Sequence, residues 1–168
     1  LSFCVLNDSE CFNSLKGLYG HQALMTRCNL QADGDDWLVS QKYDITSAST
    51  IQFDARSWET ENSINPLETP KFKVLVSETS ATDRSTFTQV GDVLQPRFFD
   101  GTNWTHYSVD LSAYAGKSVY IAIEAFYTNS LGGFIDNVEI DHVGGITNSI
   151  KSLNTDNAAN RNEPVYNL

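Results

Sequence analysis

Apolar and polar residues alternate in short segments along most of this chain, and a period of two is typical of half-buried strands. Between Ser118 and Phe126, one set of alternate residues is wholly apolar and the other contains tyrosine, glutamate and phenylalanine. Similar segments, bounded by turn residues, predict strands at Trp37–Ser40, Thr50–Ala55, Lys71–Ser77, Thr86–Val90, Thr105–Leu111, Ser118–Phe126 and Gly133–His142. No helical period persists beyond one turn. The pattern therefore predicts an all-β fold, an antiparallel β-sandwich.

Two connections carry local signals of their own. Asp110 can cap a single helical turn that Gly116 closes in the left-handed conformation, which predicts a tight link between two strands. The polar stretch from Trp58 to Pro70 predicts an exposed loop. The Asp33-Gly34-Asp35-Asp36 run holds only fragments of an EF-hand pattern and predicts a polar turn ahead of the strand that carries Trp37.

One acid stands in an apolar strand. Phe134, Val138 and Ile140 alternate with Asp136 among them, so all four would share one face. An ionised carboxylate there needs a cation, hydrogen-bond donors or a local bulge that turns it outward. Calcium is one answer, because it takes six to eight oxygen ligands from distant segments. By residue type alone, the candidate ligands are Asp136, Asp54, Asp8 and Glu10, with Asp54 on the opposite face from the inward Phe53. A hydrogen-bonded structural aspartate is the alternative.

Composition excludes several classes of function. The chain has 168 residues, 40% of them hydrophobic, with 21 acids against 11 bases and a formal charge of −10. Nucleic-acid binding requires Lys and Arg to neutralise phosphates, so this charge argues against it. No apolar run approaches the roughly 20 residues of a membrane span. The cysteines Cys4, Cys11 and Cys28 match no zinc pattern, and their pairing stays undetermined.

Aromatic residues surrounded by polar loop residues are the candidate ligand contacts. Flat rings beside polar groups can stack on a sugar or anchor a protein partner, and Trp58, Trp104 and Tyr127 are the candidates. No histidine stands in a context that also presents a nucleophile, so we expect no catalysis. Glu59 and Glu61 could imitate the acid pair of a sandwich-type hydrolase, an alternative that we do not favour.

Three segments together resemble one family. They are Asp35 to Ser40 (DDWLVS), Ser108 to Ala122 (SVDLSAYAGKSVYIA) and Phe134 to Val138 (FIDNV), and they look like the cleaved adhesin modules of gingipains and the related choice-of-anchor domains. The family often has proline after the first block, whereas this chain has Gln41. The resemblance implies a jelly roll similar to MAM and galactose-binding-like domains and to several carbohydrate-binding modules, with structural calcium in some members. The closing residues, Glu163 to Leu168, resemble the entry to a type IX secretion sorting domain.

These observations predict a jelly-roll domain over residues 1–143 and a polar linker over 144–168 that leads toward a sorting domain. By the resemblance, the expected function is non-catalytic, adhesin-like binding of a glycan or host protein, by a monomer secreted to or held on a bacterial surface. A calcium-stabilised spacer that projects other domains is the alternative from another class.

Overall fold

A computed structural model describes residues 4–7, 22–26, 34–61, 68–127, 130 and 132–144 of the chain. The strands are β1 (Cys4–Asn7), β2 (Gln22–Met25), β3 (Gly34–Asp44), β4 (Thr50–Ser57), β5 (Lys71–Ser77), β6 (Thr88–Leu94), β7 (Thr105–Asp110), β8 (Ser118–Tyr127) and β9 (Gly133–Asp141). Two short 3-10 turns, η2 (Arg84–Thr86) and η3 (Ser112–Tyr114), complete the described elements. Neither of these helical turns is long and apolar enough to span a membrane.

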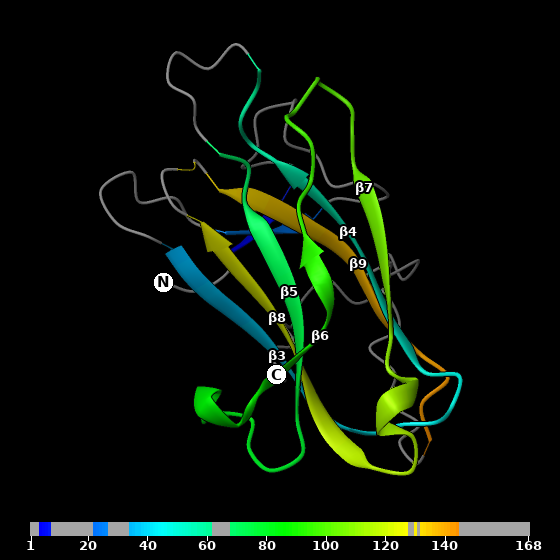
Figure 1. Cartoon of the computed structure of the whole chain (residues 1–168). Coiled ribbons are helices and arrows are strands. Elements are labelled where there is room, and N and C mark those ends of the chain that lie inside the picture. The colour runs from blue at the N-terminus through cyan, green and yellow to red at the C-terminus, as the bar shows by residue number, and fades with distance from the viewer. Residues whose placement is uncertain are drawn as a thin grey trace.

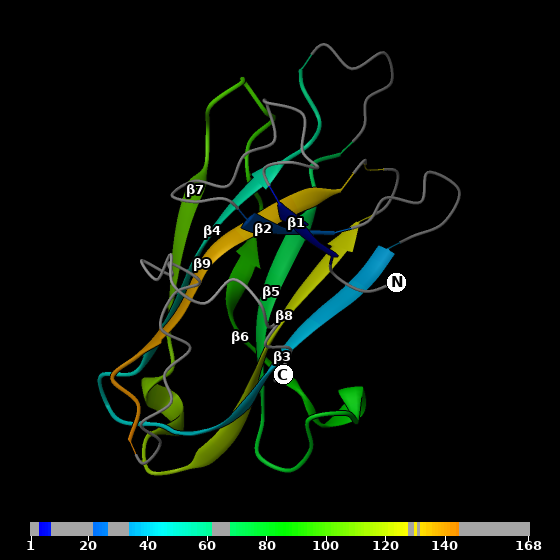
Figure 2. The ribbon, with the colours of Figure 1, turned by 180° about the vertical axis from the view of Figure 1, so that it is seen from behind.

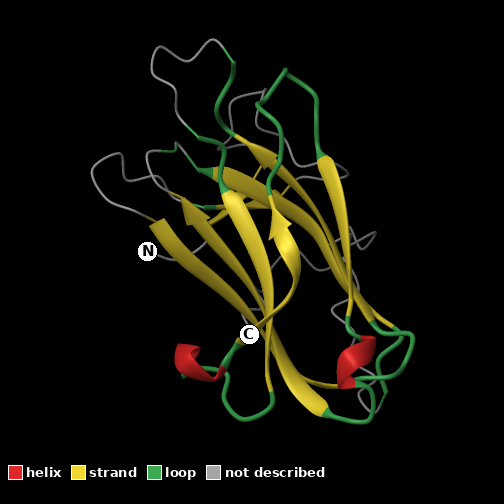
Figure 3. Cartoon of the chain, viewed as in Figure 1, coloured by secondary structure: helices red, strands yellow, loops and turns green. Residues whose placement is uncertain are grey.

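The strands form two layers. One sheet has the order β1-β2-β9-β4-β7 and the other β3-β8-β5-β6, and every pairing within them is antiparallel. Figures 1 and 3 view the molecule from the side of the four-stranded sheet, and Figure 2 from the side of the five-stranded sheet. The all-β sandwich with jelly-roll architecture is therefore confirmed.

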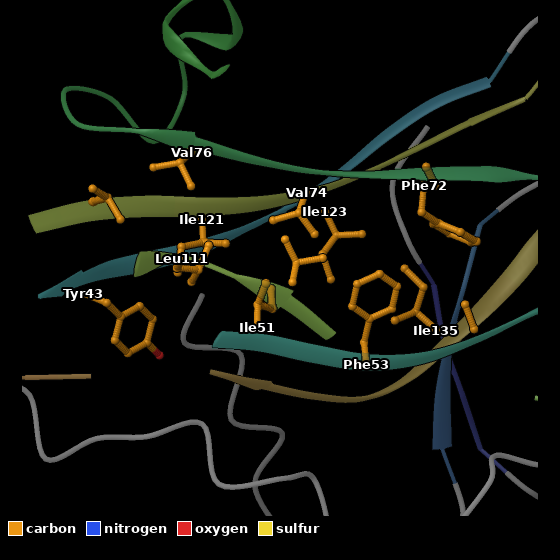
Figure 4. Close-up of a cluster of buried hydrophobic side chains, with 14 of the residues drawn as sticks. Tyr43, Ile51, Phe53, Phe72, Val74, Val76, Leu111, Ile121, Ile123 and Ile135 are labelled. Atoms are coloured by element: carbon orange, nitrogen blue, oxygen red, sulfur yellow. The ribbon is translucent and has the colours of Figure 1, made fainter. Parts of the chain in front are cut away.

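The core lies between the two sheets and follows the predicted alternation. Val119, Ile121, Ile123 and Ala125 of β8 are buried, while Tyr120, Glu124 and Phe126 are partly exposed on the other face. Figure 4 shows how the inward side chains of both layers interdigitate. The largest buried apolar side chains of this cluster are Tyr43, Ile51, Phe53, Phe72, Leu111, Ile121, Ile123 and Ile135. Each contributes about 1.5–3 kcal/mol through burial, which holds the two sheets together.

A bulge in β9 divides the predicted alternation, so the four residues expected on one face lie on two. Gln52 pairs with Glu139 and Asp54 with Asp136, so the two residues Asn137 and Val138 oppose the single residue of β4 between them. Asn137 has a positive φ of 51°, as the first residue of many bulges does. The bulge changes the phase of the strand. Asp136 and Phe134 lie on the outer face of the five-stranded sheet, whereas Val138 and Ile140 pack against the core on the other side.

Other differences concern the ends of elements. The predicted polar turn at Asp33–Asp36 is wrong from Gly34 onward, because β3 begins there and buries Asp36 at 2% exposure. The strand predicted from Thr86 starts at Thr88, after η2. Pairing with β9 positions the unpredicted strand β2, which in turn pairs with β1. Cys4 lies in β1, while Cys11 and Cys28 are outside the described residues.

The tight link between β7 and β8 has the predicted chemistry. The Asp110 carboxylate accepts hydrogen bonds from the backbone N–H and the hydroxyl of Ser112, both at 2.8 Å, and Gly116 has a φ of 81°. These two amide and hydroxyl donors hold the pKa of Asp110 below its usual value. The turn thereby orients β7 and β8 in opposite sheets.

Candidate functional site

The outer face of the four-stranded sheet carries a row of aromatic and charged side chains across three strands. Trp37 of β3 pairs with Glu124 of β8, which pairs with Lys73 of β5. Lys73 Nζ lies 3.2 Å from Glu124 Oε2 and 4.0 Å from the ring centroid of Phe126. Both charged side chains are partly buried, at 25% and 12% exposure. The row therefore alternates flat apolar rings with fixed charges, and we call it the sheet-face site, comprising Trp37, Lys73, Glu124 and Phe126.

The Trp37 ring is held in place from several sides. Its Nε1 donates to Asp35 Oδ1 at 2.5 Å, and the same carboxylate accepts from Arg84 at 2.9 Å. The Arg84 guanidinium lies 5.2 Å from the Trp37 ring centroid, within cation–π range. The ring of Phe87 meets Trp37 edge to face, with centroids 5.4 Å apart. These contacts fix one edge of the sheet-face site before any ligand arrives.

The contact between Trp37 and Phe87 spans the width of the four-stranded sheet. Trp37 is on edge strand β3, and Phe87 directly precedes the opposite edge strand β6. Two strands lie between them, so the edges of a flat sheet would be about 14 Å apart. Because the two rings touch, the connection between β5 and β6, which carries Arg84 and Phe87, reaches across this face to β3. Leu75 and Ala122, which occupy the row between them, are correspondingly buried although they point away from the main core.

A second aromatic cluster lies on the outer face of the five-stranded sheet. Arg56 is 4% exposed, and its guanidinium lies 4.5 Å from the ring centroid of Phe99 and 4.9 Å from those of Trp104 and Phe134. Trp58 stacks on Phe134 with an interplanar angle of 25° and a centroid distance of 5.5 Å. The two predicted ligand residues Trp58 and Trp104 thus belong to one cluster, which we call the Arg56 cluster.

A surface pocket of about 310 Å³ adjoins this cluster, and its lining residues come from the connection between β6 and β7 and from the start of β7. The lining residues are Arg97, Asp100, Asn103, Trp104, Thr105 and His106. Hydrogen bonds from the backbone amides of Thr102 and Asn103 hold the pKa of Asp100 below its usual value. The pocket therefore joins one indole wall to ionised and neutral polar groups.

The predicted calcium ligands are brought together only in part. Asp54 and Asp136 are cross-strand neighbours on the outer face of the five-stranded sheet. Asp54 Oδ1 lies 3.0 Å from His106 Nδ1, its Oδ2 accepts from Asn137 Nδ2 at 2.8 Å, and Asp136 Oδ1 accepts from the Asn137 amide. In the described part of the chain, no group of three or more His, Cys, Asp or Glu could hold a metal ion. Asp8 and Glu10 lie outside it, so the calcium site stays a prediction.

Sequence reasoning placed some of these residues and missed others. Tyr127 ends β8 opposite Gly34, but its side chain lies outside the described residues. Glu59, expected in an exposed loop, is fully buried, and its carboxylate accepts hydrogen bonds from the hydroxyls of Ser57 and Ser130. This burial removes the hypothetical acid pair with the exposed Glu61. Trp37 was not among the predicted ligand contacts, although its neighbours on β8 were already assigned to an outer face.

Comparison with known proteins finds likeness in structure alone. No protein-family model matches the chain, and no curated protein sequence matches it. The K3 cleaved adhesin domain of Lys-gingipain from Porphyromonas gingivalis w83 superimposes with a TM-score of 0.55 at 16% identity, covering 82% of this chain and 88% of that one. TmCBM61, solved with β-1,4-galactotriose, gives 0.52 at 12% identity over 82% and 80%. Caldicellulosiruptor saccharolyticus CBM27-1, solved with mannohexaose, gives 0.52 at 14% over 81% and 80%.

At these identities the likeness concerns the fold. The chain shares its β-sandwich with the gingipain adhesin domain and with carbohydrate-binding modules. The resemblance of the three sequence blocks to cleaved adhesins therefore agrees with the architecture.

Proposed function

We propose that this chain is a non-catalytic glycan-binding module and that the sheet-face site holds the glycan. The observation that carries the proposal is the row formed by Trp37, Glu124 and Lys73, with Phe126 beneath the ammonium group. Aromatic rings offer flat apolar surface to the C–H faces of a pyranose. A carboxylate and an ammonium beside them accept and donate hydrogen bonds to hydroxyls, which fixes the register of the sugar chain.

A neutral oligosaccharide suits this site better than an acidic one. The chain has a formal charge of −10, and a polyanionic glycan would approach against that charge. The carbohydrate-binding modules that share the fold were solved with β-1,4-galactotriose and mannohexaose, both neutral oligosaccharides, which supports this class of ligand.

The wider assignment is an adhesin-like monomer, secreted or held on a bacterial surface, that binds a glycan free or on a host protein. The shared fold of the gingipain adhesin domain supports it. A structural calcium at Asp54, Asp136, Asp8 and Glu10 is part of the same proposal, and its support is the adjacency of Asp54 and Asp136 on one face.

A glycan array followed by calorimetric titration of the best neutral oligosaccharide tests the proposal. We expect Glu124→Gln to lower the affinity about tenfold or more, because a hydrogen bond to a charged group contributes about 1.5–3 kcal/mol. The substitution preserves side-chain shape, and the amide oxygen can still accept a hydrogen bond from Lys73. Glu139→Gln is the matched control, since Glu139 is exposed on the opposite sheet.

Two results would count against the proposal. An array with no binding, together with no capture of host proteins, would favour the spacer function. Equal affinities of E124Q and E139Q would place any glycan away from the sheet-face site.

A further inference from the structure

The pocket beside Trp104 has chemistry that the sheet-face site does not use. It is lined by one indole, one guanidinium, one carboxylate and one imidazole, from Trp104, Arg97, Asp100 and His106. Trp104 contacts the outer face of the five-stranded sheet, whereas the sheet-face site belongs to the other layer. Figures 1 and 2 show the two sheets on opposite sides of the molecule, so the two surfaces are separate.

Three polar groups of this pocket have bonding capacity left within the described structure. Arg97 makes no hydrogen bond or ion pair with a described residue, and Asp100 uses only its Oδ1, which leaves Oδ2 available. His106 Nδ1 donates to the Asp54 carboxylate, so Nε2 of the neutral ring can accept a hydrogen bond. A carboxylate oxygen and a guanidinium in one pocket can accept from one hydroxyl and donate to its neighbour, as a vicinal diol requires.

The wall of the pocket is rigid. The guanidinium of Arg56, a residue that is 4% exposed, packs against the Trp104 ring. Within the preceding connection, Asn103 Nδ2 donates to the Phe98 carbonyl at 2.7 Å, and the Phe99 amide donates to the Glu59 carbonyl at 2.6 Å. An indole wall held in this way loses little conformational entropy when a ligand enters, and that favours binding.

We propose that this pocket is a second saccharide site that takes a single terminal hexopyranose with adjacent hydroxyls. The sugar stacks one C–H face on Trp104, and its vicinal hydroxyls bridge Asp100 Oδ2 and the Arg97 guanidinium. The volume of about 310 Å³ lies at the small end of the range typical of ligand pockets, which suits one sugar ring. A neutral hexose is favoured over an acidic sugar because the carboxylates of Asp100 and Asp54 lie at or beside the pocket.

The site goes beyond the proposed function, because it requires neither an oligosaccharide nor the sheet-face residues. The probes are D-galactose, D-mannose and D-glucose, each titrated into the 15N-labelled chain and followed by amide chemical shifts. We expect at least one of them to shift the amides of residues 97–106 with saturable binding. Arg97→Gln should weaken that binding about tenfold, since the charged hydrogen bond to the sugar is lost.

Arg97 is exposed and has no described partner, so R97Q retains the fold. Trp104→Phe is a second variant, which keeps an apolar ring with a smaller stacking surface. The control is E124Q, which should leave hexose binding at the pocket unchanged. No saturable shift with any of the three sugars, or equal affinity in wild type, R97Q and W104F, would overturn the second site. Loss of oligosaccharide binding in E124Q with hexose binding intact would support both sites. If E124Q binds the oligosaccharide as wild type does while R97Q loses the hexose, the sheet-face site fails and the pocket stands.

Discussion

Asn137 is the residue on which the course of β9 depends, and its substitution has a predictable cost. It adopts a φ of 51° at the bulge, a conformation that asparagine tolerates and a β-branched residue does not. Its side-chain Nδ2 also donates to Asp54 Oδ2 at 2.8 Å. Asn137→Val therefore loses about 1–2 kcal/mol to the left-handed backbone. It loses roughly a further 1.5–3 kcal/mol with the hydrogen bond to a carboxylate that is 6% exposed.

Asn137→Gly separates these two contributions. Glycine adopts the same φ without strain, so N137G loses mainly the hydrogen bond, about 1.5–3 kcal/mol. Urea unfolding should give free energies of unfolding in the order wild type, N137G, N137V, with a gap of about 1–2 kcal/mol between the variants. The slope of free energy against urea should be the same for all three, because the surface exposed on unfolding is unchanged. Equal stability of the two variants, or N137V above N137G, would refute the account of the bulge.

Three further outcomes follow from the structure. Gly132→Ala should lower the free energy of unfolding by more than about 1–3 kcal/mol, because Gly132 has a φ of 98° and a Cβ there would lie 2.5 Å from the Thr26 carbonyl oxygen. Gly101→Ala is the control: Gly101 also has a positive φ but lies in open space, so its free energy of unfolding should fall less in the same urea titration. Asp110→Ala should lower the melting temperature at neutral pH, and the difference from wild type should close as the pH falls through the depressed pKa of Asp110, which then loses its bonds to Ser112. If calcium binds the folded state, the melting temperature should fall with a chelator, since a hundredfold excess over the dissociation constant stabilises by about 2.7 kcal/mol.

The two-residue period predicted much of the fold because burial acts on whole strands. In β5 and β8 the inward residues are apolar without exception, and β5 pairs with β8 along its whole length, from Lys71 to Ser77. A slip by one residue would expose that entire set, so the sequence determines the register. The link at Asp110 was predictable for a different reason, since a cap and a left-handed glycine are local requirements.

The bulge could not be predicted by the same reasoning. The alternation of Phe134, Asp136, Val138 and Ile140 is unbroken in the sequence, yet the first two residues face outward and the last two face the core. One residue in the left-handed conformation changes the phase, and asparagine permits that conformation without requiring it. In this segment of the sequence, Asp136 is the one residue that conflicts with an apolar, inward face.

Long-range contacts set the other limit on prediction. Trp58 and Trp104 were singled out as loop aromatics, but nothing local indicates that Arg56 lies beside three rings from two other segments, the connection between β6 and β7 and strand β9. In the sequence Trp37 is one more strand residue, and only the folded connection between β5 and β6 brings Phe87 onto it. Both surfaces arise from pairs that are distant in sequence, which a periodicity cannot encode.

Edge strand β6 connects the two proposed sites. The connection before it carries Arg84 and Phe87, which pack on Trp37 over the four-stranded sheet. The connection after it carries Phe99 and leads into Trp104, which pack on Arg56 over the five-stranded sheet. The connections at the two ends of β6 thus lie over opposite outer faces. The connection before β6 supplies Phe87 to one face, and the connection after it supplies Phe99 and Trp104 to the other. If both proposed sites bind, one glycan chain and one terminal hexose occupy opposite faces, and avidity arises only from ligands long enough to reach both faces.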